Sequence, residues 1–256
     1  MLNEVRGAIR YRHYSIRTEE AYVGWIRRFI FFHGKRHPLE MAEREISQFL
    51  THLAVNGKVA SSTQNQALSA ILFLYKEVLR KELGQLQNIA RAKRPEKLPV
   101  VFTKNEVKAV LTQLDGAKWL MGQLLYGSGL RLMECIRSRV KDIDFDYKQI
   151  TVRDGKGSKD RITVLPDLVI NDLKRHLDRV KAIHERDLKE GFGTVYLPYA
   201  LEKKYINANR SWAWQYVFPA SKRSVDPRTR IERRHHISET VLQDAVKNAI
   251  RQAGIP

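Results

Sequence analysis

Apolar side chains recur at three- and four-residue intervals along most of the first third of the chain. From Ser15, a suitable helix cap, this spacing runs over about residues 16–34, with basic residues on the opposite side, which predicts an amphipathic helix. Segments 46–53 and 67–78 repeat the pattern, and the turn-forming run NGKVASST separates them. Residues 1–86 are therefore predicted to form a small helical domain.

A short basic stretch, QNIARAKRPEKLPV over residues 87–100, ends this periodicity. Its prolines oppose helix formation, which predicts a linker between two domains. The stretch carries the cationic residues Lys93, Arg94 and Lys97. We therefore expect the linker to lie along a phosphate backbone.

The rest of the chain, residues 101–256, combines helical periodicity with one pair of short strands. A helix is expected from Thr103, because Thr-Lys-Asn-Glu matches a capping box with Glu106 at the third helical position. The strands, about 149–154 and 160–165, are joined by GKGSK as a hairpin. The other predicted helices cover about 118–126, a segment after Gly129, residues 166–190 and residues 238–253. The expected fold class is mainly α with a small β-sheet (α+β).

Charge narrows the class of partner. The 256 residues include 46 Lys and Arg against 28 Asp and Glu, a formal net charge of +18. A charge of this sign and size favours a nucleic acid over an acidic small molecule. It does not distinguish DNA from structured RNA, so an RNA-binding protein stays an alternative at this point.

The single cysteine, Cys135, excludes an internal disulfide and a cysteine-based zinc cluster and fits a reducing compartment. The N-terminal sequence has no apolar signal core, and no apolar run approaches the ~18 residues that span a bilayer. We expect a cytoplasmic, nucleoid-associated protein without a membrane partner.

The sequence GSGLRLME, residues 127–134, places an arginine after a glycine turn at the start of a predicted helix. The glycines allow a tight turn, and the guanidinium of Arg131 can form two hydrogen bonds to the nonbridging oxygens of a phosphodiester. Glu134 lies three residues further on and can orient that arginine. Taken alone, these residues also fit a solvated surface arginine and an exposed ion pair.

The hairpin turn GKGSKDR, residues 155–161, offers a second phosphate-directed group. Lys156 lies between two glycines, where its ammonium can reach past a bare backbone and protonate a leaving 5′ oxygen. A lysine at a hairpin tip also serves solubility, which is the alternative interpretation. Lys159 and Arg161 are interpreted as contacts to a DNA backbone or as surface charge.

Together these residues resemble the catalytic domain of the tyrosine recombinases of the phage integrase family. The match LLYGSGLRLMECIRSRVKDIDF followed by GKGSKDRITVLP fixes the turn, the helix, the hairpin and the distance between them. The preceding helical domain and basic linker resemble the family's SAM-like core-binding domain, so the similarity covers essentially the whole chain. The resemblance implies that Arg131 and Lys156 are catalytic and Glu134 supporting, with no metal or other cofactor.

Within this family the chain resembles the integron integrases, which carry an insertion that other members lack. Here the insertion corresponds to about residues 191–236, and the resemblance implies that it engages bases extruded from a folded single-strand DNA hairpin. Rings that stack or hydrogen-bond suit this role, and a proline adds a rigid edge. The candidate DNA-binding residues are Trp214, Tyr216, Pro227, His235 and His236. From the residues alone, the alternation from Trp212 to Phe218 also fits a half-buried strand.

The resemblance implies integration and excision of gene cassettes at attachment sites, by metal-free transesterification through a 3′-phosphotyrosyl intermediate, within a tetramer on DNA. It also requires a later His-x-x-Arg, a further His or Trp and a tyrosine nucleophile. The matches at His33 and His176 lie in the helical domain and on the helix directly after the hairpin, so neither is in the expected place. We therefore expect a C-terminally truncated chain, lacking the segment that family members exchange within the tetramer. A DNA-binding fragment or remnant without cleavage activity is the alternative function.

Overall fold

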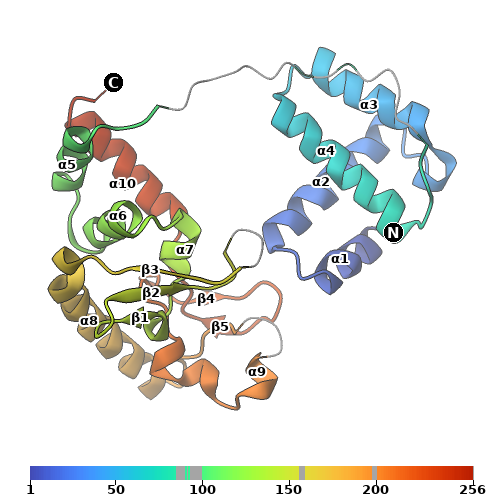
Figure 1. The fold of residues 1–256 in the computed structure, drawn as a ribbon. Coiled ribbons are helices and arrows are strands. Elements are labelled where there is room, and N and C mark those ends of the chain that lie inside the picture. The colour runs from blue at the N-terminus through green and yellow to red at the C-terminus, as the bar shows by residue number, and fades with distance from the viewer. Residues whose placement is uncertain (85–89, 91, 93–99, 156–158, 198–200, 256) are drawn as a thin grey trace. The chain divides into compact units, whose positions relative to one another are not determined.

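The computed structural model of the protein divides into two compact units, residues 1–99 and 100–256 (Figure 1). It describes the whole chain except residues 85–89, 91, 93–99, 156–158, 198–200 and 256, and the side chains of Glu202 and Lys203. Among the predicted site residues, Lys93, Arg94, Lys97 and Lys156 lie outside the described residues.

The first unit is helical, as the periodicity predicts. The predicted helix from Ser15 is confirmed, since the Ser15 hydroxyl accepts a hydrogen bond from the backbone N–H of Thr18 at 3.1 Å. A first helix, α1, was not predicted, because it buries only Val5 and Ile9 and has no side-chain cap. The elements are α1 (Leu2–Tyr11), α2 (Ile16–Phe32), a 3-10 turn (Pro38–Glu40), α3 (Glu43–Val55), α4 (Ser61–Phe73) and a π-helical turn (Leu74–Val78).

The core of this unit forms where α2, α3 and α4 pack together. Phe29 and Phe49 meet edge to face, with ring centroids 5.6 Å apart. Tyr75 is completely buried in the same cluster, and its hydroxyl donates to the carbonyl oxygens of Pro38 at 2.9 Å and Met41 at 3.2 Å. Burial raises the pKa of Tyr75 to about 12. This tyrosine is therefore a structural residue.

Gln64, on α4, fixes part of the linker to the first unit. Its side chain is buried, and its amide nitrogen donates to the carbonyl oxygens of Leu50 at 2.9 Å and Ala90 at 2.8 Å. Its amide oxygen accepts from the backbone N–H of Ala92 at 3.0 Å. The Thr51 hydroxyl also accepts from the N–H of Ala90 at 3.3 Å. Ala90 and Ala92 are thus attached to the helical unit.

The second unit combines helices with a small sheet, which confirms the predicted fold class. The Thr103 capping box is confirmed, because its hydroxyl accepts from the N–H of Glu106 at 3.3 Å while its own N–H donates to the Glu106 carboxylate at 2.7 Å. The helices are α5 (Lys104–Thr112), α6 (Gly116–Ser128), α7 (Leu132–Arg137), α8 (Ile170–Lys189), α9 (Leu201–Lys204) and α10 (Glu239–Gln252). Short 3-10 turns cover Val140–Asp142, Asp167–Val169, Ala208–Arg210 and Trp212–Trp214.

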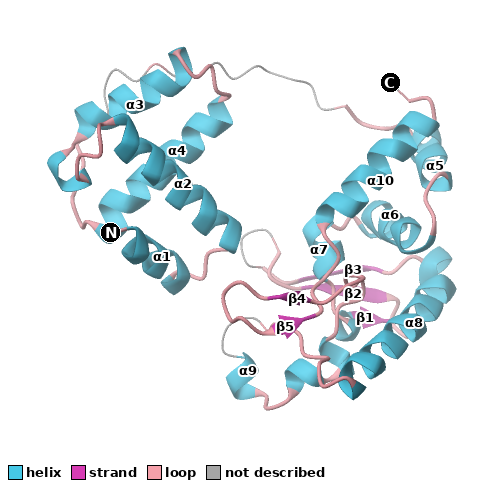
Figure 2. Cartoon of the chain, turned by 180° about the vertical axis from the view of Figure 1, so that it is seen from behind, coloured by secondary structure: helices cyan, strands magenta, loops and turns pink. Residues whose placement is uncertain are grey.

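Three antiparallel strands, β1 (Ile143–Asp144), β2 (Gln149–Val152) and β3 (Arg161–Val164), lie among α6, α7 and α8 (Figure 2). In the register of β2 with β3, Ile150 faces Thr163 and Val152 faces Arg161. Ile150 and Val152 are buried in the core, so their partners Thr163 and Arg161 also lie on the inner side of the sheet. This register turns Arg161 toward the helices.

The alternative interpretation of Trp212 to Phe218 as a half-buried strand does not fit the first half of the segment. Trp212–Trp214 forms a 3-10 turn, and only Tyr216 makes an isolated bridge, to Arg139. The basic segment after it forms a hairpin of β4 (Ser224–Val225) and β5 (Glu232–Arg233), which the sequence did not predict. Among the described residues, no helix combines the length and the apolar character that a membrane span requires.

Candidate functional site

Arg131 stands at the junction of α6 and α7. Helix α6 ends at Gly129, whose φ of 61° is a left-handed conformation suited to glycine, and Arg131 is the residue directly before α7. Its backbone N–H donates to Glu134 Oε2 at 2.9 Å, and its Nη1 donates to Glu134 Oε1 at 2.7 Å. The Arg131 side chain is 57% exposed. In the described part of the chain only Nη1 of this guanidinium has a partner, so the rest can reach a ligand.

Gly127 has a different role from the one predicted. It lies inside α6, and a Cβ atom there would approach Pro166 Cγ to 2.6 Å. Close packing between α6 and Pro166 therefore requires this glycine, whereas the turn itself depends on Gly129.

Glu134 binds two arginines at once. Besides Arg131, it accepts from Arg161, whose Nη1 donates to Oε1 at 2.9 Å and whose Nη2 donates to Oε2 at 2.6 Å. These hydrogen bonds from Arg161, followed by those from Arg131, outweigh burial and lower the pKa of Glu134 to about 2. The carboxylate is therefore ionised at neutral pH. The cluster of Arg131, Glu134 and Arg161 then carries one net positive charge.

The base of the hairpin loop lies against this cluster. The N–H of Gly155 donates to the carbonyl oxygen of Lys159 at 3.1 Å, and the N–H of Asp154 donates to Asp160 Oδ1 at 2.9 Å. Lys156 itself lies outside the described residues, whereas Lys159 is described and exposed. The structure thus fixes both ends of the loop that carries Lys156, close to the carboxylate that orients Arg131.

Tyr216, a candidate for base stacking, is 4% exposed. The guanidinium carbon of Arg139 lies over its ring at 3.7 Å from the centroid, and the His235 ring stacks at 5.4 Å. Arg139 Nη2 also donates to the Tyr216 hydroxyl at 3.0 Å. A base cannot reach this ring in the structure, so Tyr216 supports its neighbours instead. Trp214 is half-buried, with Lys141 Nζ 3.5 Å from its ring centroid.

The remaining candidates lie on or beside the β4–β5 hairpin. Pro227 is exposed in the turn of that hairpin. His235 is exposed and its Nδ1 accepts from the backbone N–H of His236 at 2.8 Å, while the two imidazole centroids are 4.0 Å apart. Although the residue is exposed, its ring is partly desolvated by the Tyr216 and His236 rings, and this, together with the charges of nearby His236 and Arg139, lowers the pKa of His235 to about 4. The His235 ring is therefore neutral at neutral pH and can stack without a charge.

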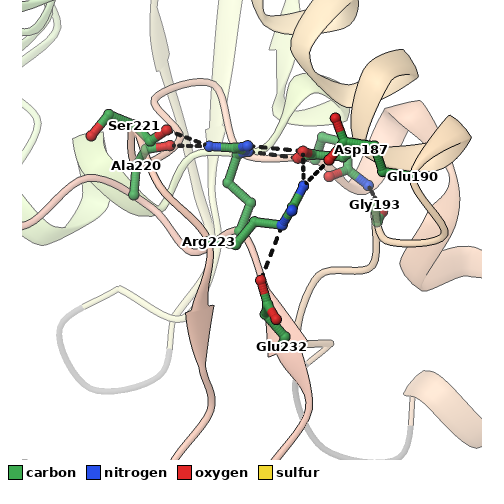
Figure 3. A network of polar contacts seen from close by, with 9 residues as sticks. Asp187, Glu190, Gly193, Ala220, Ser221, Arg223 and Glu232 are labelled. Atoms are coloured by element: carbon green, nitrogen blue, oxygen red, sulfur yellow. Dashed lines mark hydrogen bonds and ion pairs between the residues drawn. The ribbon is translucent and has the colours of Figure 1, made fainter.

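Asp187, near the end of α8, anchors this hairpin (Figure 3). It accepts from Arg234 at 2.6 and 2.8 Å and from Arg223 at 3.0 Å. Arg223 continues to Glu190 at 2.6 Å and to Glu232 at 3.1 Å. Sequence patterns did not predict this network, because its members are far apart in the chain. Its signal was the unusual density of arginines after Phe218.

Known proteins place the chain among the integrases. A model of the phage integrase N-terminal SAM-like domain matches residues 1–85, and a model of the phage integrase family matches residues 100–256. Proteins named integrase/recombinase from Escherichia coli and Pseudomonas aeruginosa are each 48% identical over 255 residues, covering 100% of this chain and 76% of theirs. The structure of XerH site-specific recombinase bound to difH substrate, a pre-cleavage complex, aligns with a TM-score of 0.56 at 15% identity, over 97% of this chain and 65% of that one. At 15% identity, the similarity to XerH shows a shared fold only.

Proposed function

The chain belongs to the phage integrase family of tyrosine site-specific recombinases, and from this premise we propose that it acts on DNA attachment sites of the integron type. The observation that carries the proposal is the Arg131 site. A guanidinium that is exposed and oriented by a buried carboxylate suits a phosphodiester, because its position is set before the ligand arrives.

The proposed reaction is a transesterification. A tyrosine hydroxyl attacks the scissile phosphorus and forms a 3′-phosphotyrosyl bond, while the bond to the 5′ oxygen breaks. Arg131 stabilises the charge that develops on the nonbridging oxygens. Lys156 gives its proton to the leaving 5′ oxygen. The energy of the phosphodiester is conserved in the new bond, so the reverse attack by a DNA hydroxyl rejoins the strands.

The tyrosine nucleophile and the His-x-x-Arg that the family resemblance implies are not found at the expected place in residues 1–256. We therefore expect a polypeptide of these residues to bind attachment-site DNA without cleaving it. A suicide substrate, nicked so that cleavage traps the covalent product, tests this directly. A covalent protein–DNA adduct formed by residues 1–256 would contradict the binding-only prediction.

Support for the integron type comes from side chains within residues 191–236. The exposed Pro227 and the neutral, exposed His235 present surfaces that suit an extruded base, and Trp214 adds a partly exposed ring. The Asp187 network fixes the hairpin that carries Pro227. We propose that this surface binds folded single-strand hairpins and that the complete recombinase works as a tetramer on DNA.

Competition binding separates this proposal from its alternatives. We expect a folded attachment-site hairpin to compete better than the same sequence as a perfect duplex, and better than an unrelated structured RNA. Equal competition by RNA and DNA would support a general RNA-binding protein instead. Equal competition by hairpin and duplex would leave a DNA-binding recombinase without the integron-type preference. All three are compared at one salt concentration, since phosphate contacts make affinity salt-dependent.

A further inference from the structure

We infer that Arg161 is a positioning residue for Arg131 rather than a DNA contact, that it acts through Glu134, and that it holds Gly155 at the base of the hairpin loop beside the same carboxylate. This inference rests on the proposed role of Arg131 in phosphate binding. It changes the sequence-based interpretation of Arg161, which was a contact to the DNA backbone or surface charge.

The first support is where β3 points the Arg161 side chain. Arg161 pairs with Val152, which is buried, so Arg161 lies on the inner side of the sheet. Its side chain is 36% exposed, against 57% for Arg131. Of the two arginines that share Glu134, Arg131 is therefore the more accessible to a ligand.

The second support is the geometry of the pair. Both Nη atoms of Arg161 donate to Glu134, one to each carboxylate oxygen, at 2.9 and 2.6 Å. Such a two-bond contact fixes the plane of the carboxylate as well as its distance. The same two oxygens accept from the backbone N–H and the Nη1 of Arg131. The orientation of Glu134 therefore determines where the Arg131 guanidinium points.

The third support is the close approach of the loop at Gly155. A Cβ atom at this position would lie 3.2 Å from Arg161 Nη1 and 2.9 Å from the carbonyl oxygen of Lys159. The backbone at the base of the loop thus packs directly on the ion pair, and glycine is needed there for space. Arg161 thus lies between two described parts of the site, Glu134 with its bound Arg131 and Gly155 at the base of the hairpin loop.

A direct phosphate contact by Arg161 would conflict with this arrangement. Each Nη atom of Arg161 gives one N–H to Glu134, so a phosphate that took these two donors would break the contact that fixes the plane of the carboxylate. Arg131 gives Glu134 a single side-chain N–H, and its side chain is the more exposed of the two arginines. Arg131 can therefore bind a phosphate while its own bond to Glu134 stays in place.

The first test follows the carboxyl group of Glu134 by NMR in the full chain and needs no DNA. Arg161→Met should raise the pKa of Glu134 into the range of ordinary carboxyls, about 4. Arg161→Lys, which keeps the charge but not the two-bond geometry, should raise it less and serves if the methionine variant does not fold. Arg175→Met is the control, because Arg175 is an exposed arginine paired with Asp172 on α8. An unchanged Glu134 pKa in both Arg161 variants would overturn the inference.

The second test is a double-mutant cycle in DNA binding, read as the slope of log K against log salt concentration. If Arg161 acts through Arg131, adding Arg161→Met to Arg131→Met leaves the slope of the single Arg131→Met variant unchanged. If Arg161 contacts a phosphate itself, the double variant loses a further ~0.9 in slope, and the inference fails. Wild-type chain that bound no DNA would contradict the proposed function, and the Glu134 titration would still decide the inference.

Discussion

The guanidinium carbon of Arg139 lies over the ring of Tyr216, 3.7 Å from its centroid, and the guanidinium donates a hydrogen bond to the same tyrosine's hydroxyl at 3.0 Å. The same arginine donates to the carbonyl oxygens of Trp214 at 2.8 Å and Tyr196 at 2.9 Å. One buried arginine thus binds three points of the segment that the sequence resemblance assigns to base recognition. Arg139 and Tyr216 form the base on which Trp214 and His235 rest.

Tyr216→Phe should therefore destabilise the second unit. The variant removes the hydroxyl that accepts from buried Arg139 but keeps the ring, so we expect a loss of about 1 to 2 kcal/mol in the free energy of unfolding. Urea denaturation of the full chain, followed by a probe in the second unit, measures it. Tyr147→Phe is a matched control, since Tyr147 is 77% exposed. Equal stability of the two variants would show that the Arg139 contact contributes nothing.

Arg131→Ala should strongly slow strand cleavage in a polypeptide that includes the tyrosine nucleophile. Removing one group that stabilises developing charge costs about 2.7 to 4 kcal/mol of activation free energy, a loss of 10²- to 10³-fold in rate. Binding should fall much less, because many other cations contribute. Single-turnover cleavage and a binding titration on the same substrate separate the two effects. Comparable losses in both would assign Arg131 to binding alone.

Glu134 should make the protein sensitive to acid. Its pKa in the folded state is lowered to about 2, so the stabilisation it provides is complete above its ordinary pKa near 4.5 and is lost as the pH falls toward 2. Glu134→Gln cannot titrate, so its stability should fall less steeply over that interval. Urea denaturation of the wild type and the variant at several pH values measures how the free energy of unfolding changes as the pH falls. The same slope in both would exclude Glu134 as the acid-sensitive group.

Trp214→Ala should weaken binding to folded hairpin DNA more than to duplex. Stacking of a base on an aromatic ring contributes about 1 to 3 kcal/mol, so we expect roughly a 5- to 150-fold loss on the hairpin alone. Trp214→Phe should recover most of the affinity, because it restores an aromatic face. Titrations of both substrates with the wild type and the two variants provide the comparison. An equal loss on duplex DNA would indicate a packing defect around Lys141 instead.

Local signals predicted local structure well. Ser15 and Thr103 cap helices as their sequences indicate, because a cap involves residues only a few positions apart. The glycine turn before Arg131 and the contact between Arg131 and Glu134 were also predicted, since these residues are only a few positions apart. These features depend on backbone geometry that a short sequence determines.

Contacts between distant residues were not predicted. Arg161 is 27 residues from Glu134, and their pairing depends on the β2–β3 register, which sets Arg161 opposite buried Val152 and so on the inner side of the sheet. Tyr216 was expected to be available to a base, yet Arg139 lies 77 residues before it and covers its ring. In both cases the residue's role depends on a distant partner, Glu134 for Arg161 and Arg139 for Tyr216, which the residue type alone does not reveal.

The attachment of Ala90 and Ala92 ties these two residues to the stability of the helical unit. The N–H of Ala92 donates to the buried Gln64 side chain, and the N–H of Ala90 donates to Thr51 on α3. Both partners belong to helices of the core, so these bonds last as long as α3 and α4 stay folded. The amide hydrogens of Ala90 and Ala92 should therefore exchange with solvent more slowly than those of an unattached chain segment.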